Sequence, residues 1–134
     1  MTQIRIRDAA LFLGVSDDTL RRWIDAGQLP ADLDDSGRKV VEGVDLARLA
    51  KEHAAAPGDP SGMSSSARNR FVGLVTKVTS DLVMSQVEIQ CGPHRVVSLM
   101  STEAVNDLGL VPGSIAVAVI KSTNVVVETP RSIS

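Results

Sequence analysis

Residues 53–65 read HAAAPGDPSGMSS, and this stretch decides the organisation of the chain. Its prolines and glycines disfavour a helix, and its small residues add little to a hydrophobic core. We therefore interpret it as a flexible linker. The 134 residues then divide into two small domains, residues 1–52 and residues 66–130.

The composition of the whole chain is that of an ordinary soluble protein, with 43% hydrophobic and 22% charged residues. No apolar run approaches the roughly 20 residues of a membrane span. The N-terminus MTQIRIRDAA lacks the apolar core of a signal peptide, so we expect a cytoplasmic protein without a membrane partner. A single cysteine, Cys91, excludes an intrachain disulfide and most zinc sites.

Charge and aromatic content restrict the modes of nucleic-acid binding. Aromatic residues make up 2% of the chain, which argues against stacking platforms for single strands. Residues 1–56 carry 8 Lys and Arg against 10 Asp and Glu, and residues 57–134 carry 6 of each. Neither half has a basic excess, so any DNA binding must come from the local placement of Arg and Lys.

The first half is predicted to be mainly helical. A first helix is expected over residues 7–13, and Ser16 is a suitable N-cap for a second. Residues 30–43 suggest an extended hairpin whose turn lies at residues 34–37. Asp45 is expected to cap a last helix.

The second half is predicted to be mainly β-structure. Short apolar or alternating runs, separated by turn signals, indicate a small barrel or sandwich with one short helix at residues 102–108. Strands are expected at residues 71–78, 82–90, 94–100, 115–120 and 125–127. The fold class is therefore α+β in two domains.

Residues 4–52 resemble the small winged helix-turn-helix of the MerR and excisionase-like families. The resemblance rests on the order of five features: a first helix, a GVS turn, a TLRRW helix, a GQLP segment and a hairpin. It implies binding to double-stranded DNA through the second helix and the hairpin, or wing. The long dimerising helix of MerR regulators is absent, so a dimer would have to form through the second half.

Helical spacing supports this reading independently. Leu20, Trp23 and Ile24 share one face of the second helix, so Arg21 and Arg22 point away from the core, as a helix in the major groove requires. The wing departs from the family pattern, because aspartates stand at positions 32, 34 and 35. The residues expected to contact DNA are Arg5, Arg7, Thr19, Arg21, Arg22, Arg38 and Lys39.

Residues 64–130 resemble the Mop or molbindin family, also called the TOBE domain. Three segments carry the resemblance, at residues 66–73, 101–113 and 119–127. It implies an OB-like, five-stranded barrel that binds molybdate or tungstate at subunit interfaces. It also implies a homo-oligomer, a dimer or larger and perhaps a hexamer, held together by this domain.

The residues at these positions suit a tetrahedral dianion, which needs hydrogen-bond donors and positive charge. The oxyanion-binding residues are expected to be Ser66, Ala67, Arg68, Ser101, Lys121 and Ser122. The resemblance implies that residues 66–68 of one chain face residues 121–122 of another. Ala104 stands where many relatives have a serine ligand, which removes one donor.

Catalysis has no support in the sequence. No nucleophile, base and acid occur in a suitable order, His53 and His94 lack partners, and no direct metal-cation ligand set is present. We expect a non-enzymatic, molybdate- or tungstate-responsive transcriptional regulator. The alternatives are a molybdate storage oligomer whose first domain serves packing or partner binding, and a DNA-architectural protein whose barrel only oligomerises.

Overall fold

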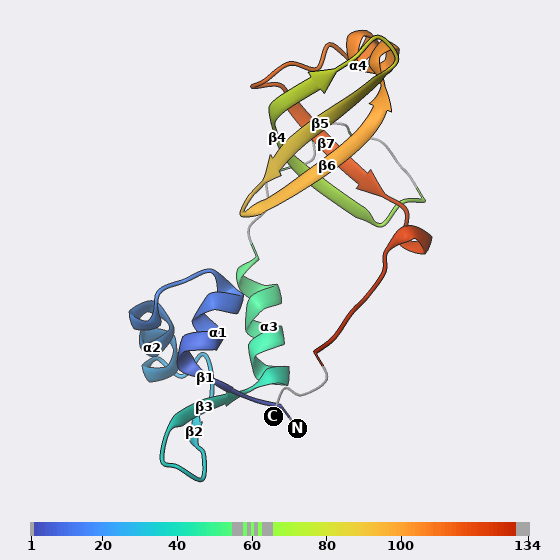
Figure 1. Cartoon of the computed structure of the whole chain (residues 1–134). Coiled ribbons are helices and arrows are strands. Elements are labelled where there is room, and N and C mark those ends of the chain that lie inside the picture. The colour runs from blue at the N-terminus through green and yellow to red at the C-terminus, as the bar shows by residue number, and fades with distance from the viewer. Residues whose placement is uncertain (1, 55–57, 59, 61, 63–65, 131–134) are drawn as a thin grey trace. The chain divides into compact units, whose positions relative to one another are not determined.

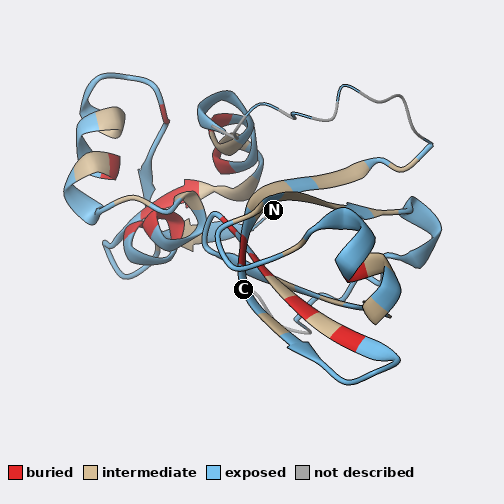
Figure 2. Ribbon diagram, turned by 90° about the horizontal axis from the view of Figure 1, so that it is seen from above, coloured by how far each residue is buried: buried red, intermediate tan, exposed pale blue. Residues whose placement is uncertain are grey.

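The computed structural model describes residues 2–54, 58, 60, 62 and 66–130, which belong to two compact units (Figure 1). One unit is Met1–Ala55 together with Thr129–Ser134, and the other is Ala56–Glu128. Each unit has its own buried residues (Figure 2). Most of the predicted linker, residues 53–65, lies outside the described residues, so its boundaries stay a prediction.

The first unit confirms the expected order of helix, turn, helix, hairpin and helix. Its helices are α1 (Ile6–Leu13), α2 (Asp17–Asp25) and α3 (Gly43–His53). Strands β1 (Gln3–Arg5), β3 (Lys39–Glu42) and β2 (Asp32–Leu33) form an antiparallel sheet with β3 in the middle. The sequence pattern did not indicate β1, because three residues are too few to show an alternation.

Local chemistry explains most of these boundaries. Ser16 caps α2 as predicted, and its Oγ accepts a hydrogen bond from the Thr19 backbone N–H at 3.1 Å. The prediction that Asp45 caps α3 is wrong, because the helix already begins at Gly43. The Gly43 N–H donates to the Thr2 carbonyl oxygen at 2.8 Å, so the neighbouring strand supplies that cap.

The core of the first unit joins all three helices to the sheet. Leu20, Leu29 and Leu49 are almost completely buried within it. Trp23 packs against the edge of this core, as the sequence suggested, and its ring stacks on His53 with centroids 4.4 Å apart. This contact ties the end of α3 to α2, the helix expected to read DNA.

The second unit is a curled antiparallel sheet with strand order β6-β5-β4-β7 (Figure 1). Its strands are β4 (Asn69–Ser80), β5 (Met84–Cys91), β6 (His94–Ser101) and β7 (Ile115–Ile120). Helix α4 (Thr102–Leu108) follows β6, and the short 3-10 helix η1 (Ser122–Asn124) follows β7.

The strand expected at residues 125–127 is not part of the sheet among the described residues. Val126 and Val127 are each 85% exposed. A strand is stabilised by a hydrogen-bonded neighbour, and a three-residue apolar run does not determine whether its own chain provides one. The described sheet of one chain therefore has four strands, where the resemblance implied five.

The buried core of the second unit is small. It consists of Val75, Val87, Ile89, Cys91 and Val105. Many large apolar side chains of the same unit are at least two-fifths exposed, among them Leu74, Val97, Leu99, Leu108, Val111, Ile115 and Val119. Exposed apolar surface of this kind is typical of a face that contacts another molecule.

None of the helices in the described part of the chain is long and apolar enough to cross a membrane.

Candidate functional sites

Helix α2 presents a polar surface on the side opposite its buried residue, Leu20. Arg21 and Arg22 are exposed, as predicted. The Thr19 hydroxyl oxygen accepts from the Ser16 hydroxyl at 3.0 Å and from an Arg22 guanidinium N–H at 3.2 Å. Thr19 therefore links the helix cap to Arg22 and restrains one side of that guanidinium group, which has five N–H donors.

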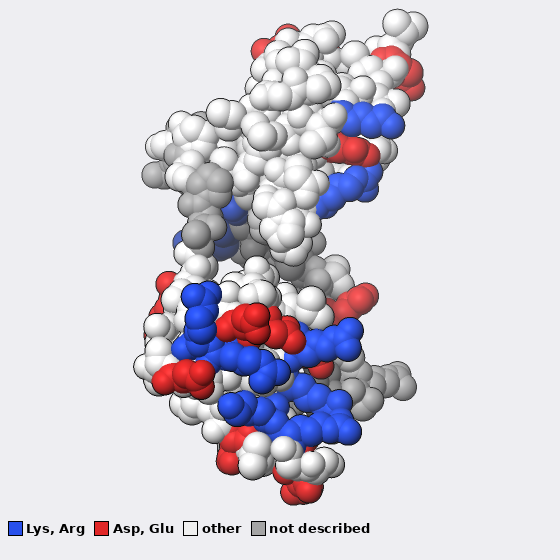
Figure 3. Space-filling model, turned by 90° about the vertical axis from the view of Figure 1, so that its left-hand side faces the viewer, with Lys and Arg blue, Asp and Glu red and all other residues white. Residues whose placement is uncertain are grey.

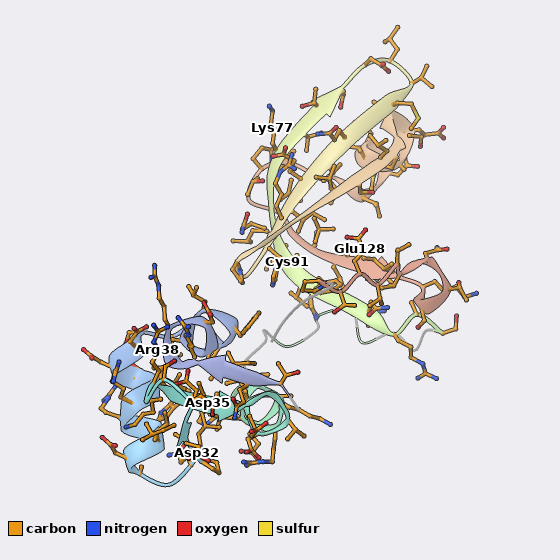
Figure 4. All side chains as sticks on the ribbon, turned by 60° about the horizontal axis from the view of Figure 1, so that its bottom comes forward. Asp32, Asp35, Arg38, Lys77, Cys91 and Glu128 are labelled. Atoms are coloured by element: carbon orange, nitrogen blue, oxygen red, sulfur yellow. The ribbon has the colours of Figure 1, made fainter. Side chains whose placement is uncertain are left out.

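The remaining predicted DNA residues lie on the sheet, on the wing and at the start of α1. Arg5 ends β1 opposite Val40 of β3, and Arg7 lies in the first turn of α1. Arg38 and Lys39 come from the hairpin that joins β2 to β3, which also carries Asp32 and Asp35 (Figure 4). The side chains of these four predicted residues, Arg5, Arg7, Arg38 and Lys39, are exposed.

The surface of the first unit carries both positive and negative side chains. One face of the unit gathers many Lys and Arg side chains, with Asp and Glu side chains between them (Figure 3). The positive charge is thus concentrated locally, although residues 1–56 carry more acidic than basic residues. Exposed charges interact over only about 8–10 Å at physiological salt, so the local arrangement of cations and anions on this face matters more than the net charge of the unit.

Most of the predicted oxyanion residues come together at one end of the second unit. Residues 66–68 lead into β4, and Lys121 and Ser122 follow β7. Strands β4 and β7 pair antiparallel with Asn69 opposite Ile120, and the Asn69 side-chain N–H donates to the Ile120 carbonyl oxygen at 3.2 Å. We call the set Ser66, Ala67, Arg68, Lys121 and Ser122 the first donor group.

The expectation that these two segments meet across two chains stays a prediction. Within one chain, the pairing of Asn69 with Ile120 means that residues 66–68 and residues 121–122 extend from the same end of the β4–β7 pair. In the first donor group, Ala67 is half-buried and the other members are exposed. The group offers hydroxyl, guanidinium and ammonium donors and contains no carboxylate, so it suits an anion.

Ser101, the sixth predicted residue, lies at the opposite end of the same sheet. It pairs with Met84 at the start of β5, while Ser80 at the end of β4 pairs with Ser85. The first donor group lies at the start of β4, and the 12 residues of this strand correspond to roughly 35–40 Å of strand length. Ser101 is therefore separated from the first donor group by the length of the sheet.

Ser101 is held in a defined orientation at its end of the sheet. It is the N-cap of α4, and its Oγ accepts from the Ala104 backbone N–H at 3.1 Å. Because this bond uses the oxygen as an acceptor, the hydroxyl hydrogen can still be donated to an anion.

A chain of hydroxyl groups that the sequence interpretation missed anchors this end of the sheet. The Ser85 Oγ lies 2.7 Å from the Ser80 Oγ and 2.9 Å from the Thr102 Oγ1, and Thr102 donates to the Asp81 carbonyl oxygen at 2.8 Å. Each hydroxyl has one hydrogen, so the donation runs from Ser80 to Ser85, then to Thr102 and to Asp81.

Ser85 is 1% exposed and is the buried polar residue of the described core. The sequence could have indicated the burial of Ser85. It alternates with Val87 and Ile89 along β5, so its side chain points to the same buried face of the sheet. A buried serine hydroxyl needs hydrogen-bond partners. Here the partners are the hydroxyl groups of Ser80 and of Thr102, which follows Ser101 in the chain.

Asp81 shapes the adjacent β4–β5 turn. Its carboxylate accepts from the backbone N–H groups of Met84 and Val83, each at 2.8 Å, and these bonds lower the pKa of Asp81 below its ordinary value. The described residues contain no group of three or more His, Cys, Asp or Glu side chains suited to a metal ion.

Comparisons with known proteins agree with the two-part organisation. Residues 65–127 match the TOBE domain family, and residues 4–54 match a helix-turn-helix domain family. The chain is 41% identical over 66 residues to molybdenum-pterin-binding protein 3 of Clostridium pasteurianum, a match that covers 48% of this chain and 97% of that protein.

Two further relatives are longer. The chain is 41% identical over 68 residues to the molybdenum transport protein ModE of Herbaspirillum seropedicae, which covers 50% of this chain but 25% of that protein. Among solved structures it resembles the cytoplasmic molybdate-binding protein ModG with molybdate bound. That match has a TM-score of 0.50 and 38% identity, and it covers 54% of this chain and 52% of that one.

Proposed function

Because this chain belongs to the TOBE-domain family and carries a helix-turn-helix domain at its N-terminus, we propose that it is a cytoplasmic DNA-binding regulator that responds to molybdate or tungstate. The proposal treats the protein as a sensor and not as an enzyme. The observation that carries it is the division of the oxyanion donors between the two ends of β4. Such a division makes ligand binding depend on the assembly of several chains.

The ligand would be held between copies of the chain. The first donor group of one copy would face Ser101 of a second copy, so that neither copy contains a complete site. The hydroxyl, guanidinium and ammonium donors match the oxygens of a tetrahedral dianion. The distance along β4 supports this arrangement, since one copy cannot bring both half-sites to one ion.

The second unit also offers a surface for such an assembly. An apolar groove is lined by residues of β5, β6, β7 and the segment that contains α4, including Val97, Leu108 and Ile115. These three side chains are 42%, 67% and 68% exposed in the single chain. Covering them in a homo-oligomer would remove apolar area from water, at about 25 cal/mol per Å².

DNA would be read by α2 in the major groove and by the wing on the adjacent backbone. Arg21 and Arg22 supply donors for base edges and phosphates, and Arg38 supplies a cation at the wing. The oxyanion would alter DNA binding by favouring one arrangement of subunits over another, because a ligand shifts an equilibrium only through differential affinity.

The decisive experiment tests whether the oxyanion site is shared. Lys121→Ala removes a cation from the first donor group, and Ser101→Ala removes the opposite hydroxyl. Each variant alone should bind molybdate weakly in calorimetric titration, with sulfate and phosphate as competitors. Oligomers co-assembled from both variants should regain part of the wild-type sites, because one interface then combines two intact half-sites.

Failure of the mixed oligomers to recover any binding would refute a shared site. Absence of molybdate binding by the wild-type protein would refute the sensor proposal as a whole. DNA binding is tested separately with Arg22→Ala, which should lose affinity for duplex DNA and keep its affinity for molybdate.

A storage role is the second candidate. It is supported by the match that covers 97% of a molybdenum-pterin-binding protein, and by the aspartates of the wing. A storage protein would form a large oligomer with several oxyanions per chain. DNA binding whose affinity falls steeply with salt would decide against this candidate.

A further inference from the structure

The wing carries negative charge at a position where the proposed function requires contact with phosphate. Asp32, Asp34 and Asp35 lie in the same hairpin as Arg38 and Lys39; Figure 4 labels Asp32, Asp35 and Arg38. Three carboxylates near a DNA backbone would weaken binding if they acted only through their charge. Their hydrogen bonds show that they differ from one another.

The Asp34 carboxylate closes the turn of the wing. Its Oδ1 accepts from the backbone N–H of Arg38 at 2.8 Å and from that of Ser36 at 2.9 Å. The Asp34 backbone N–H donates to the Arg38 carbonyl oxygen at 2.8 Å, and its own carbonyl oxygen accepts from Gly37 at 3.0 Å. Asp34 thus holds both backbone groups of Arg38.

The turn also depends on glycine at position 37. Gly37 has φ of 78°, a left-handed conformation that residues with a Cβ rarely adopt. This conformation lets the chain reverse within residues 34–38 and return to β3. The backbone of Arg38 is therefore set by one side chain, Asp34, and one special backbone angle.

We propose that Asp34 is a positioning residue of the DNA interface: its carboxylate closes the wing turn and so presents the Arg38 guanidinium to a DNA phosphate. This role rests on the proposed function, since it assumes that the first unit binds DNA. Asp35 differs, because it is exposed and no hydrogen bond within the described turn involves its carboxylate.

The charge of Asp34 is already engaged within the turn. The N–H groups of Arg38 and Ser36 donate to its carboxylate and lower the pKa of Asp34, and the nearby charges of Arg38 and Arg5 act in the same direction. The negative charge that faces the wing cations is therefore partly satisfied before DNA arrives.

The sign of the mutational effect distinguishes positioning from simple repulsion. Asp34→Ala and Asp35→Ala each remove one negative charge from the wing, and Asp34→Asn removes the charge but keeps an acceptor oxygen. If charge alone mattered, all three variants would bind a mixed-sequence DNA duplex more tightly than the wild type. Positioning predicts that Asp35→Ala and Asp34→Asn bind at least as tightly as the wild type, and that Asp34→Ala binds about tenfold more weakly.

Two further measurements on the full chain test the role of Asp34: the salt dependence of DNA affinity, and hydrogen exchange at the backbone amides of the wing turn. Asp34→Ala should reduce the slope of log affinity against log salt by about 0.9, the value for one lost phosphate contact. Hydrogen exchange at the Ser36 and Arg38 amides should accelerate in Asp34→Ala and stay slow in Asp34→Asn. This second readout does not depend on DNA binding.

Two results would overturn the role of Asp34. One is Asp34→Ala binding DNA as tightly as Asp35→Ala with an unchanged salt slope. The other is unchanged amide exchange at Ser36 and Arg38 in Asp34→Ala. A wild-type protein that does not bind duplex DNA even at low salt would instead refute the proposed function, and this role with it.

Discussion

Gly73 lies directly against the backbone of a neighbouring strand, and replacing it with alanine should destabilise the second unit selectively. A Cβ at this position would overlap the Gln90 carbonyl oxygen and would lie 2.7 Å from the Cys91 Sγ. The first obstacle is backbone of the neighbouring strand β5, which cannot rotate away. The curled sheet that lies between Ser101 and the first donor group therefore depends on the absence of a side chain at Gly73.

The size of the effect follows from two opposing contributions. Inserting a methyl group into a packed region costs about 1–3 kcal/mol, and a backbone obstacle places Gly73→Ala near about 3 kcal/mol. Replacing glycine by alanine restricts the unfolded chain and returns about 0.4–1 kcal/mol. The net loss is about 2 kcal/mol, which corresponds to a melting temperature lower by about 8–16 °C for a unit of this size.

Thermal unfolding of the full chain tests this prediction. Far-UV circular dichroism follows both units, whereas fluorescence of Trp23, the single tryptophan, follows the first unit alone. Gly58→Ala is the matched control, because no atom of the described residues lies within 4 Å of a Cβ at Gly58. Adding Cys91→Ala to Gly73→Ala should relieve only the sulfur contact and restore part of the stability.

If the second unit of Gly73→Ala melts within about 2 °C of the wild type, the predicted clash at Gly73 does not destabilise it. Full recovery in the double variant, relative to Cys91→Ala alone, would show that the backbone contact with Gln90 is unimportant. A large shift in the Trp23 transition would show that the effect is not confined to the second unit.

Four other predictions follow from single contacts. Ser85→Ala breaks two bonds of the buried hydroxyl chain, so the second unit should lose about 2 kcal/mol of unfolding free energy in chemical denaturation, and molybdate binding should weaken in calorimetry. Ala104→Ser adds a hydroxyl to the first turn of α4, and the molybdate dissociation constant should fall about tenfold, with an unchanged constant counting against a site at α4. The pKa of Asp81 is lower in the folded state than in the unfolded state, so its stabilising effect is present above the unfolded pKa and is lost as pH falls through the folded pKa. The stability advantage of the wild type over Asp81→Asn should therefore stay constant well above pH 3.8 and shrink as the pH falls through and below 3.8 in thermal melts, and a constant difference would contradict this cause. Ser16→Ala removes the cap of α2 and should cost about 1 kcal/mol in the unfolding transition reported by Trp23 fluorescence, while the second unit melts unchanged.

Much of the local structure was predictable because its causes are local. Ser16 followed by an amphipathic helix, and the turn at residues 34–37, each depend on residues within one or two turns of chain. The alternation of Val87, Ile89 and Cys91 likewise reports one buried face of one strand. Such periodicities are properties of a segment, so they are visible before its neighbours are known.

The errors have the opposite origin. The Asp45 side chain has the right chemistry for an N-cap, but helix α3 begins two residues earlier, at Gly43. There the Gly43 N–H donates to the Thr2 carbonyl oxygen, which the pairing of β1 with β3 places beside the helix start. The segment at residues 125–127 has the composition of a strand but no partner strand within the described chain. The start of α3 thus depended on a contact with a residue distant in sequence. The segment at residues 125–127 lacked such a contact and therefore did not form a strand in the described sheet.

By itself, the sequence determined two domains of different class, the capped second helix of the first domain, and the residue types that suit an oxyanion. The tertiary structure alone decided where those residues lie. The strand order β6-β5-β4-β7 puts the segments that contain Arg68 and Lys121 at one end of the sheet and Ser101 at the other end. Hydrophobic alternation shows which face of a strand is buried but not which strand lies next to it, and only that pairing separates Ser101 from the first donor group.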